Sequence, residues 1–206
     1  MKEERKLTEK EKIRTEKIQK ILDQKAEEGY ARKDLTISIS LANIMAIVLG
    51  LPFCALFFIL FISQNTIDKN THFLLLAISF VVFTIVHELI HGFFWGICVP
   101  HKFKSIEFGF IVEMLTPYCT CLEPLKKNQY IIGSIMPGLL LGFVPSLVSV
   151  WTGSFDLLLF GLIMIIGAGG DFTILLKLLS YKGKENTIYL DHPTECGLIV
   201  LEKESA

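Results

Sequence analysis

The chain has 206 residues, a formal net charge of −1 and a hydrophobic share of 51%, and its mean hydropathy is +0.52. This balance, without a basic stripe interleaved with aromatic side chains, argues against a nucleic-acid-binding protein. The five cysteines are odd in number, and Cys54 and Cys98 lie in apolar runs, which argues against a small secreted protein built on disulfides. The apolar residues are gathered into long runs that exclude charge, which is typical of a membrane protein.

Residues 1–34 are densely charged and predict a cytoplasmic N-terminal helix. Thr8 and Glu11 have the spacing of a capping box, which would start this helix. Ile18 and Leu22 form only a thin apolar stripe, so we interpret the helix as solvated and lying beside the membrane rather than as a partner-binding helix. This stretch lacks a short apolar core with a small-residue cleavage site, and we therefore expect no cleavable signal peptide.

Residues 35–206 predict one membrane-embedded, zincin-like domain. A helix needs about 20 mostly apolar residues to cross the bilayer core, and four segments meet that length. The expected spans are residues 35–62, 73–99, 130–151 and 155–179. The fold class predicted from this pattern is an all-α membrane protein with about four transmembrane helices.

The lysines between the spans predict how the chain crosses the membrane. The first loop contains only Lys69, whereas the second contains Lys102, Lys104, Lys126 and Lys127. The third loop contains no lysine or arginine, and both terminal segments contain several. Because positively charged loops stay on the cytoplasmic side, we expect a multi-pass protein of the cell membrane with both termini in the cytoplasm.

The second loop also has the alternating pattern of a β-strand. Bulky apolar side chains recur at every second position over residues 106–113, Pro117 breaks the run, and residues 118–122 can return as a second strand. We therefore expect a small β hairpin near the cytoplasmic membrane surface. The tail has a similar pattern, with short strand-like runs at residues 187–190 and 197–201 on either side of a turn.

The second predicted span carries His87, Glu88 and His91 in the H-E-x-x-H pattern. Residues four apart share one face of a helix, so both imidazoles can bind one tetrahedral zinc ion. We predict Zn²⁺ as the cofactor, the two histidines as ligands and Glu88 as the general base on a zinc-bound water. A chance match is plausible on a soluble helix, but burying these three side chains in an apolar span is costly and so indicates function.

Asp171 is the expected third ligand, because it is the one acidic residue well inside another predicted span. His87 lies 14 residues into its span (87 − 73) and Asp171 lies 16 residues into its own (171 − 155). Both spans run in the same direction, and a rise of about 1.5 Å per residue places the two side chains at similar depth. The small residues 167–170 would let the helices approach closely. The competing interpretation is an aspartate neutralised near the membrane edge, with Lys177 snorkelling below it.

Other candidate ligands have weaker support. Cys119 and Cys121 form a single C-x-C pair, which is a weak metal signal without further partners. The remaining acidic and imidazole groups near the membrane surface are interpreted as interfacial residues rather than ligands: Glu113, Glu123, His101 and His192.

The third predicted span contains a proline, Pro137, which is expected to kink the helix.

Several short motifs together carry a family resemblance over roughly residues 70–200. These motifs are His87-Glu88-Leu89-Ile90-His91-Gly92, Phe108-Gly109-Phe110, Thr116-Pro117-Tyr118, Gly170-Asp171 and Asp191-His192-Pro193. With them the chain resembles the putative zincin peptidase family of small bacterial membrane proteins. It is more distantly similar to the site-two protease class of intramembrane metalloproteases. That class takes its third zinc ligand from an aspartate in a later helix, and by position this is Asp171.

We therefore predict a membrane-embedded zinc metalloendopeptidase that hydrolyses peptide bonds in or near the bilayer. Its expected partners are the lipid bilayer and a membrane-protein or peptide substrate. The substrate would have to unwind, since a helix hides its own carbonyls, and the hairpin edge at residues 106–112 could hold it by strand addition.

Two alternatives come from other functional classes. In a transporter or metal carrier, intramembrane histidine and aspartate relay protons or ions. A degenerate protease would bind a partner segment without cutting it. Glu88 favours the active protease, because a relay or scaffold has no particular need of a carboxylate beside the first histidine.

Overall fold

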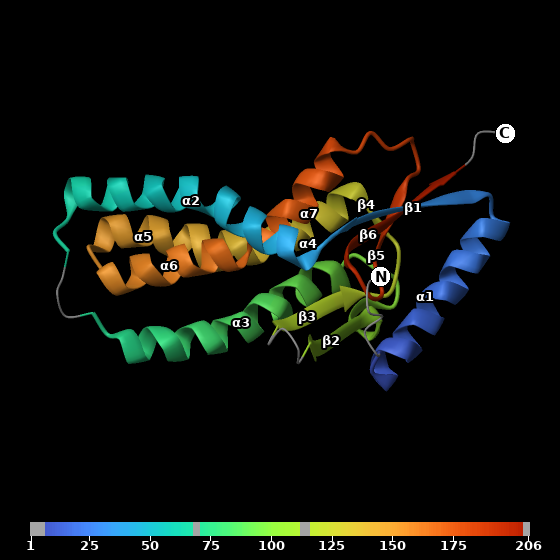
Figure 1. Cartoon of the computed structure of the whole chain (residues 1–206), viewed down its shortest axis with the longest axis horizontal. Helices are drawn as coiled ribbons and strands as arrows, with labels where there is room; N and C mark the ends of the chain where they lie inside the picture. The colour runs from blue at the N-terminus through green and yellow to red at the C-terminus, as the bar shows by residue number, and fades with distance from the viewer. Residues whose placement is uncertain (1–6, 68–70, 112–115, 204–206) are drawn as a thin grey trace.

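The computed structural model describes residues 7–67, 71–111 and 116–203. Long helices run side by side along one half of the molecule, and the other half contains the β-strands and the N-terminal helix (Figure 1). Helix α3 (Phe73–Gly96) passes from the first half into the second, so that its C-terminal part lies against strands. The H-E-x-x-H motif therefore lies where the helical and β-containing halves meet.

Three helical segments are long and apolar enough to cross a membrane: α2 (Ile39–Gln64), α3 and the segment Lys127–Thr152. A candidate fourth span is the pair α6 (Phe155–Gly167) and α7 (Gly169–Ser180), which are bent by 47° at the break between them. Large apolar side chains cover the exposed surface of these helices. The molecule is thus mostly helical with three or four candidate spans, as expected, and it fits a multi-pass membrane protein.

The third span is irregular in its middle. It begins as α4 (Lys127–Pro137), continues as the π-helical segment η3 (Gly138–Phe143) and ends as α5 (Val144–Thr152). Proline lacks a backbone N–H and its ring clashes with the preceding turn, so a kink was expected at Pro137. The helix changes from α to π directly after that residue.

The fourth span differs from the continuous helix that was expected over residues 155–179. It breaks at Ala168, between α6 and α7. At the break, α2 and α7 lie in very close contact, because a Cβ on Gly169 would come within 2.2 Å of the Ala46 Cα. Gly169 therefore allows α7 to pack closely on α2, whereas residues 167–170 were expected to bring the fourth span close to the second.

The expected hairpin is present as β2 (Ile106–Ile111) and β3 (Thr116–Cys121), an antiparallel pair. Pro117 was expected to break the run but lies within β3, opposite Phe110. Glu113, one of the weaker candidate ligands, lies outside the described residues.

A second sheet has four antiparallel strands in the order β1-β6-β5-β4. The tail strands β5 (Ile188–Asp191) and β6 (Cys196–Lys203) match the strand-like runs seen in the sequence. Strand β1 (Tyr30–Ile37) pairs with β6, and the short β4 (Leu125–Lys126) pairs with β5. Residues 35–37, expected to start the first span, belong to β1 instead, because they pair with residues 196–198 of the distant tail strand β6.

The N-terminal helix α1 (Glu9–Glu27) begins with the predicted capping box of Thr8 and Glu11. Its apolar stripe is not solvated as expected, because Ile18 and Leu22 are buried against the four-stranded sheet. Two leucine-sized contacts of this kind stabilise the attachment by a few kcal/mol at most, roughly 1.5–3 kcal/mol per fully buried side chain. Helix α1 is therefore a packed part of the β-containing half.

Candidate metal centre

His87 and His91 lie one turn apart on the same face of α3, and both side chains are buried. Their Nε2 atoms are 3.1 Å apart. The carboxylate of Asp171 reaches the same point from the first turn of α7, with oxygens 3.0 Å from Nε2 of His87 and 3.4 Å from Nε2 of His91. Two helices of the bundle thus bring the three predicted ligands together.

The arrangement of these atoms fits a tetrahedral zinc ion. Zinc binds histidine nitrogen at about 2.0–2.1 Å, so two ligand atoms of a tetrahedral site lie about 3.3 Å apart. The separations of 3.0, 3.1 and 3.4 Å match that value. Among the described residues, these three form the group of His, Cys, Asp and Glu side chains that could hold a metal. Three protein ligands leave a fourth position open, as catalytic zinc sites require.

The ring of His91 is oriented by two contacts. Its Nδ1–H donates a hydrogen bond to the Gly133 carbonyl at 2.8 Å, which leaves Nε2 free to bind a metal. On one face the ring stacks on Trp95, with centroids 5.0 Å apart and planes 16° apart. Gly133 leaves room for Trp95, since a Cβ there would lie 2.0 Å from its Nε1. Both contacts hold the imidazole in one orientation.

Asp171 owes its position to the break in the fourth span. Helix α7 starts at Gly169, so the aspartate lies in the first turn of a new helix. Carboxylates are favourable at this end of a helix because its free N–H groups carry partial positive charge. Ala168, at the break, is fully buried. The bend therefore directs Asp171 from α7 to the two histidines on α3.

Glu88 follows the first histidine and lies off the ligand group, between α3 and β3. The backbone N–H of Cys119 hydrogen bonds to its carboxylate. Close approach of the hairpin to α3 requires small residues on the helix, because a Cβ on Gly92 would lie 2.5 Å from the Phe108 ring. The hairpin thus forms one wall beside Glu88, which is where the sequence placed a general base.

A family model described as putative zincin peptidase matches residues 80–185, which is 106 of the 206 residues and just over half of the chain. The chain belongs to the putative zincin peptidase family. The match runs from α3 to the end of α7 and includes all four predicted site residues. No curated protein and no solved structure matches the chain significantly. Membership of a zincin family implies zinc, for which the three gathered ligand atoms are suited.

One buried carboxylate in this zincin family member was not assigned a role from sequence. Asp191 in β5 accepts hydrogen bonds from the Cys121 backbone N–H at 2.8 Å, the Tyr130 hydroxyl at 2.7 Å and the Thr120 hydroxyl at 3.2 Å. Burial raises the pKa of Asp191, and these hydrogen bonds oppose that shift. The residue links the tail sheet to both β3 and α4. Its only signal in the sequence was the Asp191-His192-Pro193 motif.

The other candidate ligands of the zincin chain are bonded elsewhere. Glu123 accepts hydrogen bonds from the Ser105 hydroxyl and from His101. The Nδ1 of His192 accepts from two backbone N–H groups in its own loop. The Cys121 thiol donates a hydrogen bond to the Glu123 carbonyl, with sulfur and oxygen 3.5 Å apart. Within the described chain these groups form no second metal cluster.

Proposed function

We propose that this chain is a membrane-embedded zinc metalloendopeptidase that hydrolyses peptide bonds in or near the bilayer. The observation that carries the proposal is the convergence of His87, His91 and Asp171, with ligand atoms 3.0–3.4 Å apart, on helices apolar enough to span a membrane. Side chains of this kind are costly in lipid and are normally kept there for function. The family match supports a metallopeptidase over a range that includes these residues.

The roles of the residues follow from their geometry. A zinc ion held by the three ligands would polarise the scissile carbonyl and make an attacking water more acidic. Glu88 takes the proton from that water and delivers it to the leaving amide nitrogen, acting first as base and then as acid. The Gly133 carbonyl holds the tautomer of His91 that presents Nε2.

The substrate is proposed to bind in extended form along the hairpin. The N–H groups of Cys119 and Cys121 point away from β2, toward Glu88 and Asp191. By the alternation of an antiparallel pair, the N–H and C=O groups of Phe108 and Phe110 then lie on the outer edge of β2. No strand of the described residues pairs with that edge, so a substrate strand could be added there.

The decisive experiment combines zinc stoichiometry with cleavage of a model membrane peptide by purified wild-type protein and the Glu88→Gln variant. The amide keeps the shape of the side chain but loses the base, so zinc should remain bound while turnover falls roughly 10²- to 10⁴-fold. Near-normal turnover in Glu88→Gln would remove Glu88 from its proposed role. Wild-type protein that binds zinc but cleaves no peptide would favour a partner-binding, degenerate protease instead.

A further inference from the structure

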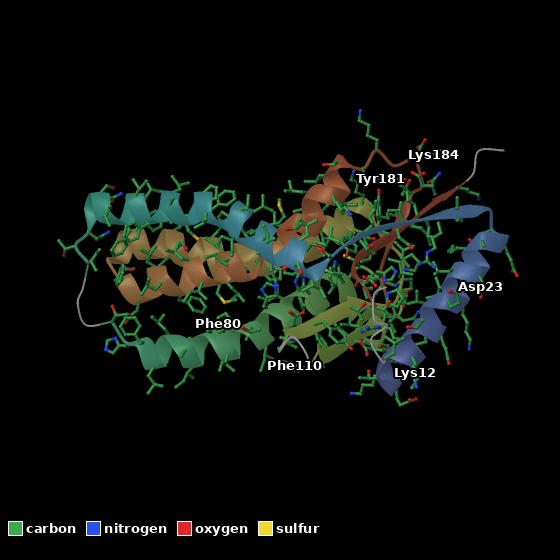
Figure 2. All side chains as sticks on the ribbon, in the orientation of Figure 1. Lys12, Asp23, Phe80, Phe110, Tyr181 and Lys184 are labelled. Atoms are coloured by element: carbon green, nitrogen blue, oxygen red, sulfur yellow. The ribbon has the colours of Figure 1, made fainter. Side chains whose placement is uncertain are left out.

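Two cavities border the contact between α3 and α6, and Leu76 lines both. One, of about 240 Å³, reaches the His72–Asp156 pair, whose side chains are 2.7 Å apart. The other has a volume of about 420 Å³ and an entirely apolar wall, and we name it the α3–α6 groove. Figure 2 labels Phe80, which lies on α3 in this wall. The groove is lined by Phe73, Leu76, Ala77, Phe80, Leu159 and Ile163.

The α3 side of the groove leads along the helix to the general base. Phe73, Ala77 and Phe80 follow one another at steps of four and three residues. Seven residues beyond Phe80, which is close to two turns of an α-helix, the same stripe reaches His87, with Glu88 beside it. A segment lying in the α3–α6 groove therefore directs one end at the H-E-x-x-H motif.

Of the three long candidate spans, α3 is also the one that the rest of the described chain covers least. Only 11% of its most apolar window is buried, compared with 17% for α2 and 39% for the span Lys127–Thr152. The helix that carries the H-E-x-x-H motif thus leaves most of its apolar surface to the surroundings. Because the groove lies within spanning helices and its wall offers no hydrogen-bonding side chain, its occupant has to be apolar and to arrive through the lipid.

We propose that the α3–α6 groove receives an apolar membrane-spanning helix of the substrate, which enters sideways from the bilayer and meets Glu88 at one end. This inference rests on the proposed function and names its substrate class, a membrane-spanning protein. A helix satisfies its own backbone hydrogen bonds and so suits an apolar wall. At Glu88 the helix meets β3 of the hairpin, and the unwound end of the substrate reaches the outer edge of β2, where the backbone groups of Phe108 and Phe110 are not paired with β3.

Photo-crosslinking tests this binding without requiring cleavage. A photoreactive amino acid replaces Leu159 in full-length Glu88→Gln protein in lipid vesicles. The probe is a single-pass peptide with about 20 leucine and alanine residues in its span. We expect a covalent adduct between the chain and the peptide. The matched control carries the same amino acid at Leu157, a second leucine of α6 that lines the other cavity, and most of the adduct should be lost there.

Filling the groove supplies a second, catalytic readout. Leu159→Trp adds bulk to the groove, so the bound helix would have to shift. The ratio of kcat/KM for the spanning peptide to kcat/KM for a short soluble peptide should therefore fall about tenfold. Leu157→Trp adds the same bulk to the other cavity and should leave this ratio unchanged. Zinc stoichiometry of both variants checks that the metal centre is intact.

Each alternative occupant gives a distinct result. Adducts with lipid alone, adducts between two copies of the chain, or equal peptide adducts from both leucine positions would each overturn the groove proposal. Wild-type protein that cleaves a soluble peptide while Leu159 yields no peptide adduct would overturn the groove and leave the proposed protease. A Leu159-specific adduct in a protein that cleaves neither peptide would support the groove and refute the protease.

Discussion

Asp171 is the residue on which the proposed zinc site depends most, because it joins two helices that are far apart in the sequence. Its carboxylate lies within 3.0 Å of His87 and 3.4 Å of His91. A carboxylate inside an apolar bundle is costly unless a cation neutralises it. A divalent metal is the strongest such partner, so the aspartate and the ion should depend on one another.

Asp171→Ala should therefore lower zinc occupancy and activity together, as His87→Ala and His91→Ala should. Asp171→Asn should hold zinc only weakly, since the amide keeps the shape and loses the charge. Metal analysis of detergent-purified variants measures the effect. Asp156→Ala is the matched control, because that aspartate also lies in α6–α7 but is bonded to His72. If the Asp171→Ala variant binds zinc as tightly as the wild-type protein does, the third ligand must be another residue.

Gly133 is proposed to keep His91 in the orientation that binds zinc. Its missing side chain admits Trp95, and its carbonyl orients His91. Gly133→Ala should push Trp95 off the imidazole and weaken zinc binding roughly 10- to 100-fold, the usual cost of losing a group that orients a ligand. Competition with a chelator measures the affinity. Gly167→Ala, where nothing lies within 4 Å of the added Cβ, should change it little. Equal affinities in both variants would contradict the orienting role.

Local spacing was enough to predict the residues that could bind metal, but not those that orient them. His87, Glu88 and His91 lie within five consecutive positions of one helix, and Asp171 was proposed because charge is rare in apolar spans. The Gly133 carbonyl is a backbone group 42 residues from His91, and nothing in a glycine marks it as an acceptor. Partners of that kind become visible only when the helices are packed.

At the scale of elements, the hairpin and the break in the fourth span position the site. The hairpin lies against the C-terminal part of α3 and brings the Cys119 N–H to Glu88. Helix α1 holds the hairpin from its other side, through Lys17 and Glu107, whose charged atoms are 2.7 Å apart. As an exposed pair this contact stabilises by about 1 kcal/mol or less, so α1 is held mainly by its apolar contacts.

Phe110→Pro tests whether the outer edge of β2 binds substrate. Phe110 is half exposed, and its N–H lies on the outer edge, so proline removes a donor to substrate without breaking the ladder to β3. Cleavage of a membrane peptide should be lost while zinc stays bound. Phe110→Ala removes the ring and keeps the N–H, and should retain most activity. Full activity in Phe110→Pro would refute strand addition at this edge.

The sequence predicted those elements whose pattern is local and missed those that depend on distant pairing. The spans, the hairpin and the two tail strands have their own periodicity. The residues of β1 were assigned to the charged N-terminal segment and to the first span, because their alternation of apolar and polar side chains is weak. They form a strand only through pairing with β6. The bend at Ala168 was missed for a related reason, since the two helices together still have the length and composition of one membrane span.

For the whole molecule, the relative position of its first and last elements bears on how often it crosses the membrane. Ile18 and Leu22 of α1 pack against Ile199 and Leu201 of β6. Elements packed together lie on the same side of a bilayer, so the number of crossings between them is even. Three helices are long and apolar enough to cross a membrane, and the bent pair α6–α7 is the candidate for a fourth crossing. We therefore expect the bent pair to cross the bilayer completely rather than to form a re-entrant loop.

The same argument predicts the orientation, because the lysine-rich segments adjoin the β-containing half and lysine favours the cytoplasmic side. Tags on both termini should be protected in intact cells, and a cysteine in the first loop should react with an impermeant thiol reagent from outside. Asn65 is a poor position for that cysteine, since its amide donates to the Val150 carbonyl at 2.9 Å. The exposed Thr66 avoids this loss, and Thr66→Cys in a background without the native cysteines isolates the signal. Labelling of the termini together with protection of position 66 would invert the topology, and labelling of one terminus alone would show that α6–α7 does not complete a crossing.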